Sequence, residues 1–128
     1  MNKKLFVVVI LMFPMFIVAS CDNSIKTATF HVHNYSQFQV TEIYVSSSSS
    51  ENRFKDILEP GENCTLVSEW EIPYNTLSIP ISFYMNGEEY GTREREEAMT
   101  DTRRFKPYKR ISNGDTVTVK IYDNTWEW

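Results

Sequence analysis

The chain has few of the residues from which small catalytic and metal-binding sites are usually built. It holds two cysteines, two histidines and four glycines among 128 residues. No glycine-rich phosphate loop, serine nucleophile elbow or cysteine–histidine signature occurs in it. With two cysteines it cannot carry a disulfide framework of several bridges. The sequence therefore lacks the local motifs by which many small enzymes are recognised, and we expect neither an enzyme nor a bound cofactor.

An excess of basic residues is also missing. Thirteen Lys and Arg stand against 17 Asp and Glu, a formal net charge of −4. Nucleic acid is thus an unfavourable partner, because binding it requires a basic face. The same balance predicts no electrostatic attraction of the chain to an anionic membrane.

The first twenty residues have the three parts of a secretory signal peptide. Lys3 and Lys4 form a basic start, Leu5 to Ala19 is an apolar run interrupted by Pro14, and small residues follow. A membrane-spanning helix needs roughly 20 predominantly apolar residues, and this run is shorter. The pattern predicts that residues 1–20 are a cleaved export signal.

The end of this segment, Val18-Ala19-Ser20-Cys21, resembles the lipobox of bacterial lipoproteins. The resemblance implies that the Cys21 thiol is diacylated and that cleavage makes Cys21 the first residue of the mature protein. It implies a partner, the membrane, and a location in the bacterial cell envelope outside the cytoplasm. Asp22 is similar to an inner-membrane retention signal of enterobacterial lipoproteins, but sorting rules differ between lineages, so the inner and outer membranes both stay open. If Cys21 is acylated, Cys64 has no cysteine to pair with, and we expect it to be a small apolar residue packed in a strand.

The remainder predicts a short tether, residues 21–26, and one domain, residues 27–128. Apolar and polar residues alternate with period two in several stretches, as in half-buried strands. The expected strands cover 27–33, 38–45, 54–58, 64–72, 77–85, 88–92, 105–111 and 116–122, with a bulge near Thr41 and Glu42 and turns at 59–62, Asn86-Gly87 and Asn113-Gly114. The stretch 54–58 could instead be one helical turn, Ser46–Ser50 is expected to be a loop, and 93–104 a charged loop or short helix.

Seven or eight short strands with little helix are typical of an all-β fold, here a small antiparallel β-sandwich of immunoglobulin-like architecture. The segment Phe54 to Gly61 is also weakly similar to a patch in small uncharacterised bacterial β-sandwich proteins. This similarity covers eight residues and implies kinship of fold only.

Two groups of side chains are candidates for binding. His31 and His33 lie two residues apart on one strand face and are weak candidates for a metal, although a zinc site needs three or four ligands; the alternative is a solvated strand face. Tyr84, Tyr90, Tyr122, Trp126 and Trp128 could form an aromatic binding patch, since tyrosine and tryptophan combine an apolar body with a polar tip. The alternative is that Trp126 and Trp128 cover an open side of the core.

These observations favour a non-catalytic binding or assembly module of the envelope that recognises protein or glycan. A dedicated accessory or inhibitor-like subunit of an envelope complex is the alternative, and a hydrolase a more distant one.

The lipid anchor is directly testable. We expect metabolic palmitate labelling and membrane association of the wild-type protein, and loss of both in a Cys21→Ala variant, because the thiol is the site of acylation. Intact mass measures the acyl chains. A soluble, unlabelled wild-type protein would contradict the lipobox interpretation, and Cys21 could then pair with Cys64.

Overall fold

The computed structural model describes residues 25–45, 54–71 and 74–128. The predicted signal peptide (1–20), Cys21 and the serine run Ser46–Ser50 lie outside these described residues. The elements in chain order are β1 (Lys26–Asn34), β2 (Val40–Val45), β3 (Phe54–Leu58), β4 (Asn63–Trp70), β5 (Thr76–Ser78), β6 (Ile81–Met85), β7 (Glu88–Arg93), α2 (Arg95–Ala98), β8 (Phe105–Pro107), β9 (Arg110–Ser112), β10 (Thr116–Ile121) and β11 (Trp126–Glu127). β1 begins one residue before the predicted domain boundary at 27, and 54–58 is a strand rather than a helical turn.

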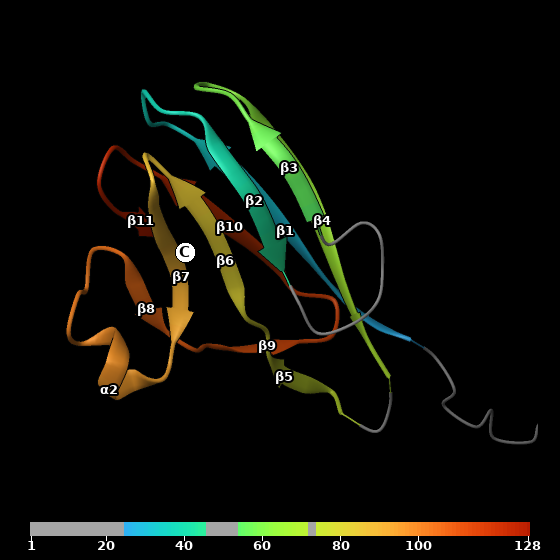
Figure 1. Ribbon diagram of the computed structural model, residues 1–128. Helices are drawn as coiled ribbons and strands as arrows, with labels where there is room; N and C mark the ends of the chain where they lie inside the picture. Colours follow the sequence, from blue (N-terminus) through green and yellow to red (C-terminus); the bar gives the residue numbers. More distant parts are fainter. Residues whose placement is uncertain (1–24, 46–53, 72–73) are drawn as a thin grey trace, which may run out of the picture.

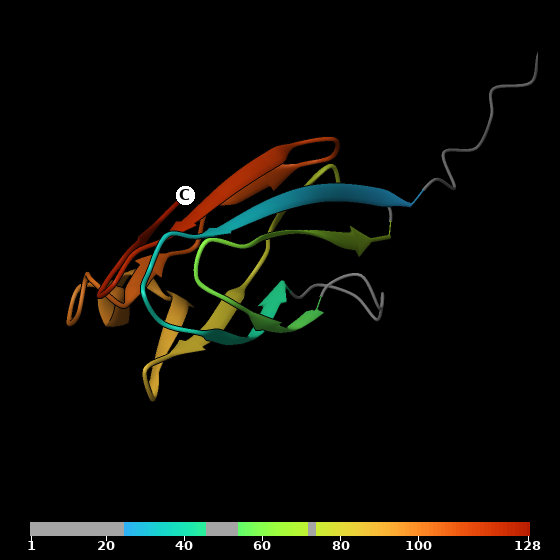
Figure 2. The same ribbon diagram turned by 90° about the horizontal axis from the view of Figure 1, so that it is seen from above.

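The strands form two layers, as the sequence predicts for a β-sandwich. Sheet A has the order β11-β10-β1-β4, and sheet B has the order β3-β2-β6-β7-β8 (Figure 1). Seen from above, sheet A lies over sheet B (Figure 2). A small ribbon of β5 and β9 runs across one end of the two layers. The mostly β, sandwich-like fold is thereby confirmed.

The core lies between the layers and follows the period-two pattern of the sequence. In β1, Ala28, Phe30 and Val32 are buried, while the alternate residues are half-buried on the outer face. Sheet B supplies Phe83 and Met85 from β6 in the same way. The largest fully buried side chains are Trp126, Phe30, Phe83, Ile43, Leu58, Ile79, Ile81, Met85, Ile111, Ile121, Val32 and Val40.

The prediction of purely antiparallel sheets is wrong at two pairings. β1 pairs with β10 in parallel, with Phe30 opposite Val117, and β7 pairs with β8 in parallel. Alternation reports which face of a strand is buried but carries no information on the direction of its neighbour. Both pairings join strands that are not connected by a tight turn, so no hairpin signal could have revealed them.

Two predicted strands are each divided in two. The stretch 77–85 is interrupted at Ile79-Pro80, so that β5 pairs with β9 while β6 belongs to sheet B. Proline has no N–H for a strand ladder, which explains a break at this position. The stretch 105–111 is likewise split into β8 and β9. These divisions and the short β11 raise the number of strands in the described part of the chain to eleven.

The predicted turns and bulge are confirmed. The pairing of β2 with β6 shifts register between Thr41 and Tyr44, and Glu42 has a φ of 51°. Asn86 and Gly87 have φ values of 51° and 77°, as a two-residue hairpin turn requires. The Glu62 N–H donates to the Glu59 carbonyl (3.0 Å) across the Pro-Gly turn. α2 falls within the predicted charged segment, and no helix among the described residues is long and apolar enough to cross a membrane.

Gly91 in β7 provides a test of the sheet B packing. A Cβ at this position would overlap the carbonyl oxygen of Ile81 on the neighbouring strand, whereas a Cβ at Gly87 would meet no atom within 4 Å. We expect Gly91→Ala to lower the free energy of unfolding by about 3 kcal/mol or more, because backbone must move. Gly87→Ala, which carries only the strain of positive φ, should cost about 1–2 kcal/mol. Equal urea midpoints for the two variants would contradict this packing.

Candidate functional site

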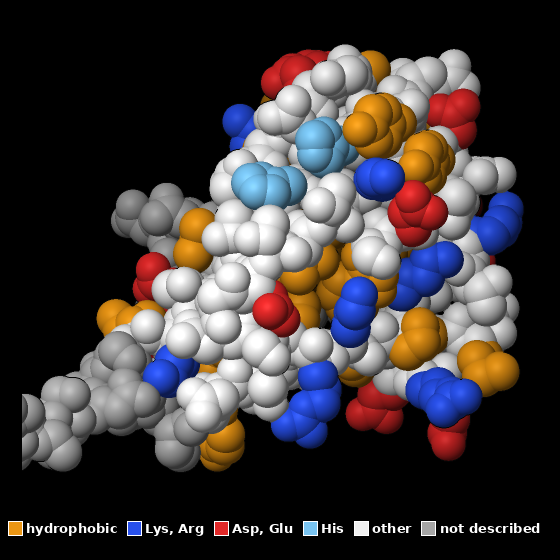
Figure 3. Space-filling model, turned by 180° about the vertical axis from the view of Figure 1, so that it is seen from behind, with side chains coloured by type: hydrophobic (Ala, Val, Ile, Leu, Met, Phe, Trp, Pro, Cys, Tyr) orange, Lys and Arg blue, Asp and Glu red, His pale blue; other side chains and the backbone are white. Residues whose placement is uncertain are grey.

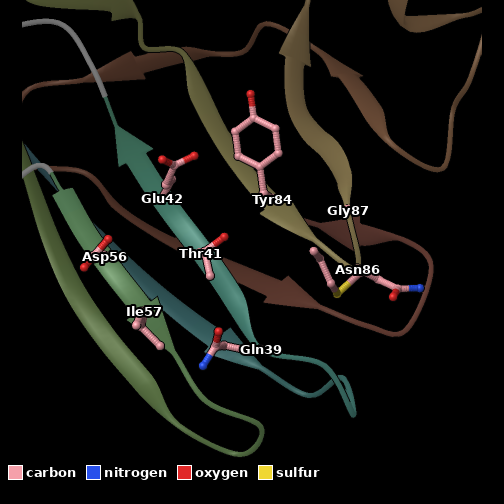
Figure 4. A pocket seen from close by; sticks show the side chains of 9 residues that line it. Gln39, Thr41, Glu42, Asp56, Ile57, Tyr84, Asn86 and Gly87 are labelled. Carbon is pink, nitrogen blue, oxygen red and sulfur yellow. The ribbon is translucent and has the colours of Figure 1, made fainter.

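The outer face of sheet B carries an open groove of about 590 Å³. It extends across three neighbouring strands, from Ile57 on β3 past Thr41 on β2 to Tyr84 on β6 (Figure 4). Its lining residues are Gln39, Thr41, Glu42, Asp56, Ile57, Tyr84, Met85, Asn86 and Gly87. The floor of the groove is therefore formed mainly by hydrogen-bonded strands rather than by a loop.

Local sequence explains why these side chains face outward. Tyr84 alternates with Phe83 and Met85, whose burial in the core leaves the Tyr84 side chain on the other face, 40% exposed. The bulge in β2 adds one residue, so that Thr41 and Glu42 both line the groove. β3 is an edge strand in which only Leu58 is buried, and Ile57 stays 44% exposed opposite Thr41.

The groove is acidic. Glu42 and Asp56 both contribute carboxylates, and none of the nine lining residues carries a positive charge. Neither carboxylate forms an ion pair with another described residue. Gln39 Nε2 donates a hydrogen bond to Glu59 Oε1 (2.7 Å), which leaves the Gln39 amide oxygen available as an acceptor. A ligand would meet one aromatic ring, one aliphatic side chain and several hydrogen-bonding groups.

These groups can contact a ligand that is partly apolar. The nine lining residues include no Ser, Cys, Lys or His, but the Glu42 and Asp56 carboxylates can act as bases as well as hydrogen-bond acceptors. An exposed ring beside carboxylates and amides matches ligands that have both an apolar face and several hydroxyl groups.

The five aromatic residues predicted to form one patch do not lie together. Tyr90 (3% exposed) and Trp126 (1% exposed) are core residues, and both contact Phe83, with ring centroids 5.3 and 5.8 Å apart. Burial and a neighbouring Glu88 raise the pKa of Tyr90 above its ordinary value. The patch hypothesis is thus wrong as a single surface, because Tyr84 lies on sheet B, while Tyr122 and Trp128 directly follow β10 and β11 of sheet A.

Trp126 and Trp128 cover an open side of the core, as the alternative interpretation of these two residues predicted. Trp126 is enclosed, and its indole N–H donates to the Arg104 carbonyl (2.8 Å). Trp128 is half-buried beside it, with 5.6 Å between the ring centroids. The Lys109 ammonium lies 5.6 Å from the centre of the Trp128 ring.

Tyr122 belongs to a second aromatic surface, on the outside of sheet A. His33, Tyr35 and Tyr122 form a stack with centroid distances of 5.7 and 5.9 Å. The Tyr122 hydroxyl donates to Glu127 Oε1 (3.1 Å), and desolvation together with this carboxylate raises the pKa of Tyr122. Figure 3 shows the two histidines on this face, next to exposed apolar side chains.

His31 and His33 point to the same side of β1, as predicted, but each ring has another contact. His31 Nδ1 forms a hydrogen bond with Thr65 Oγ1 (3.0 Å), and His33 stacks on Tyr35. No group of three or more His, Cys, Asp or Glu side chains within the described ranges is arranged to hold a metal ion. A metal at this pair would therefore lack a third described ligand.

Cys64 lies on β4 as a free, half-buried thiol that packs partly against the core. Burial raises the pKa of the Cys64 thiol, and the positive charge of Lys55 lowers it to a smaller extent. A raised thiol pKa disfavours the reactive thiolate. The placement agrees with a packing residue in a strand.

Comparison with known proteins identifies no relative: no protein-family model, curated protein or solved structure matches the chain. The site must therefore be interpreted from its own geometry. Of its residues, sequence analysis found Tyr84 and missed Gln39, Asp56 and Ile57. The predicted bulge at Thr41 and Glu42 was the available signal, because a bulge often redirects side chains to one face.

The two terminal tryptophans should contribute unequally to the stability of the fold. We expect Trp126→Ser to lower the free energy of unfolding by about 3–5 kcal/mol, as for removal of a large buried aromatic side chain. Trp128→Ser should cost clearly less, because that ring is only half-buried. Denaturant unfolding of both variants measures the difference, and a loss at Trp128 as large as at Trp126 would contradict the assignment of Trp126 to the core.

Proposed function

We propose that this protein is a lipid-anchored, non-catalytic binding module of the bacterial cell envelope and that its ligand is a glycan held in the sheet B groove. The acylated residue is Cys21, and residues 1–20 are the export signal. We further propose that the sandwich has an immunoglobulin-like arrangement. The two facing sheets, of four and five strands, support this arrangement.

The observation that carries the proposal is the composition of the groove. Tyr84 presents an exposed ring on which the C–H face of a sugar can stack, and Ile57 extends the apolar surface. Glu42 and Asp56 can accept hydrogen bonds from sugar hydroxyls, and charge-assisted hydrogen bonds are roughly twice as strong as neutral ones. Gln39, Thr41 and Asn86 add neutral polar groups to the same groove.

Charge narrows the class of glycan. Two carboxylates without a described cation partner repel an anionic sugar and favour one that is neutral or carries an amine. We therefore expect neutral hexoses and amino sugars to bind better than uronic or sialic acids. The strand platform should change little on binding, since its backbone is fixed by pairing on both sides of β2.

A glycan array with the purified protein tests the proposal. We expect binding to neutral or amino-sugar glycans and a loss of about tenfold or more in Tyr84→Ala, since aromatic stacking contributes about 0.5–1.5 kcal/mol in addition to the apolar area it buries. Tyr108→Ala is the matched control, because Tyr108 is 43% exposed and does not line the groove.

Melting temperatures of the two variants distinguish a loss of binding from a loss of folding. Both variants should melt within a few degrees of the wild type, because each removes an exposed ring. Absence of binding to every glycan, or equal losses in the two variants, would contradict a glycan site in the groove.

A further inference from the structure

The groove on sheet B follows a row of side chains that crosses three strands. Strand pairing places Ile57 of β3 opposite Thr41 of β2, and Thr41 opposite Tyr84 of β6. Tyr84 pairs in turn with Glu89 of β7, whose carboxylate forms an ion pair with Arg93 (2.8 Å). The row therefore begins at the edge strand β3 and ends at a neutralised pair on β7. We name Ile57, Thr41 and Tyr84 the first row.

A second row crosses the same three strands nearer the C-terminal end of β2. Strand pairing places Phe54 of β3 opposite Tyr44 of β2, and Tyr44 opposite Ser82 of β6. Tyr44 and Ser82 each stand between two buried residues of their strands, so both face outward, as the first row does. The rings of Tyr44 and Phe54 meet edge to face, with 6.0 Å between their centroids. We name Phe54, Tyr44 and Ser82 the second row.

The second row continues the apolar surface of the groove without its charges. Phe54 is 44% exposed, as much as Ile57 in the first row. None of the three residues of the second row is charged at neutral pH, and two of them carry hydroxyl groups. Lys55 follows Phe54, but it pairs with the buried Ile43, and its charge acts on the Cys64 thiol of sheet A. Lys55 therefore belongs to the inner side of β3, and the second row offers aromatic rings and neutral polar groups.

The separation of the two rows sets the size of a ligand that contacts both. Tyr84 and Phe54 lie two strands apart, roughly 10 Å at about 4.8 Å per strand, and they also belong to different rows. One pyranose ring is too short for this separation, whereas a few linked sugars span it. The exposed Glu42 lies in the bulge of β2 between Thr41 and Tyr44. Figure 4 shows Glu42 and the Tyr84 ring toward the arrowhead of β2, the end of the strand on which Tyr44 lies.

We infer that the ligand of this domain is a linear oligosaccharide that crosses both rows, with one sugar stacked on Tyr84 and another, further along the chain, on Phe54. The inference rests on the proposed glycan-binding function of the groove and narrows its ligand class. Between the two rings, Glu42 accepts hydrogen bonds from the middle of the oligosaccharide. Glu42 and Asp56 favour sugars that carry an amine. A monosaccharide uses the first row alone.

A titration with sugars of increasing length tests the inference. The purified protein is titrated with glucosamine and with the dimer, trimer and tetramer obtained from chitosan, and backbone amide shifts are followed by NMR, which also measures weak binding. We expect the tetramer to bind about tenfold or more tightly than glucosamine, because it gains the aromatic contact at Phe54. The amides of Phe54 and Ser82 should shift with the tetramer and not with glucosamine.

Two variants of Phe54 separate the second row from the first. Phe54→Ala and Phe54→Leu should each bind the tetramer about tenfold more weakly and glucosamine unchanged, because both lack the ring. Phe54→Leu keeps an apolar side chain on the edge strand, so a loss in this variant is not a loss of strand packing. Tyr84→Ala should weaken the binding of glucosamine and tetramer alike. Tyr108→Ala, 43% exposed and outside both rows, is the control and should change neither affinity.

Failure of the inference and failure of the proposed function give different results. If affinity does not rise with chain length, or if both Phe54 variants bind the tetramer like the wild type, the inference is overturned, while weaker binding in Tyr84→Ala still supports the groove. If Tyr84→Ala binds every sugar like the wild type, the proposed site in the groove is wrong as well. Absence of binding to glucosamine and to all three oligomers also overturns the inference, and the glycan array then decides on the proposed function alone.

Discussion

The burial of Trp126 between the two sheets is the interaction on which most of the structure depends. Its ring belongs to the last strand of sheet A and meets Phe83 of sheet B edge-on, while its N–H donates to the Arg104 carbonyl. Thr125 donates to the Arg103 carbonyl next to it. One end of the chain thus closes the core and also holds the segment from which β8 and β9 begin. The groove on sheet B lies on the outer side of a sheet whose inner side packs against this ring.

Sequence patterns predicted the local structure of this protein better than its connections. Ala28, Phe30 and Val32 face the core because strands alternate, and Asn86-Gly87 turns because both residues tolerate positive φ. The bulge at Thr41 and Glu42 was predicted because the alternation of apolar residues shifts by one position between Val40 and Ile43. Strand direction has no such signature. The parallel partners of β1 and β7 come from distant segments, and only tertiary packing determines them.

The binding groove was only partly predictable for the same reason. Tyr84 stood out as an aromatic on a polar face, but Asp56 and Ile57 reach the same groove from an edge strand whose neighbour could not be inferred. Tyr90 and Trp126 show the converse error. Each stood on a predicted polar face or near the end of the chain, and each is buried with its ring against Phe83. Whether an aromatic side chain is buried therefore depends on the residues that the folded chain packs against it, and local sequence does not show these.

Net charge averages over surfaces that a ligand meets separately. Residues 103–110 contain five Lys and Arg and no Asp or Glu, while the lining of the groove on sheet B holds two carboxylates and no cation. Electrostatic attraction acts over roughly a screening length, so each surface responds to its own neighbours rather than to the sum. The formal charge of −4 therefore does not determine which ligands the groove prefers, because that preference depends on Glu42 and Asp56.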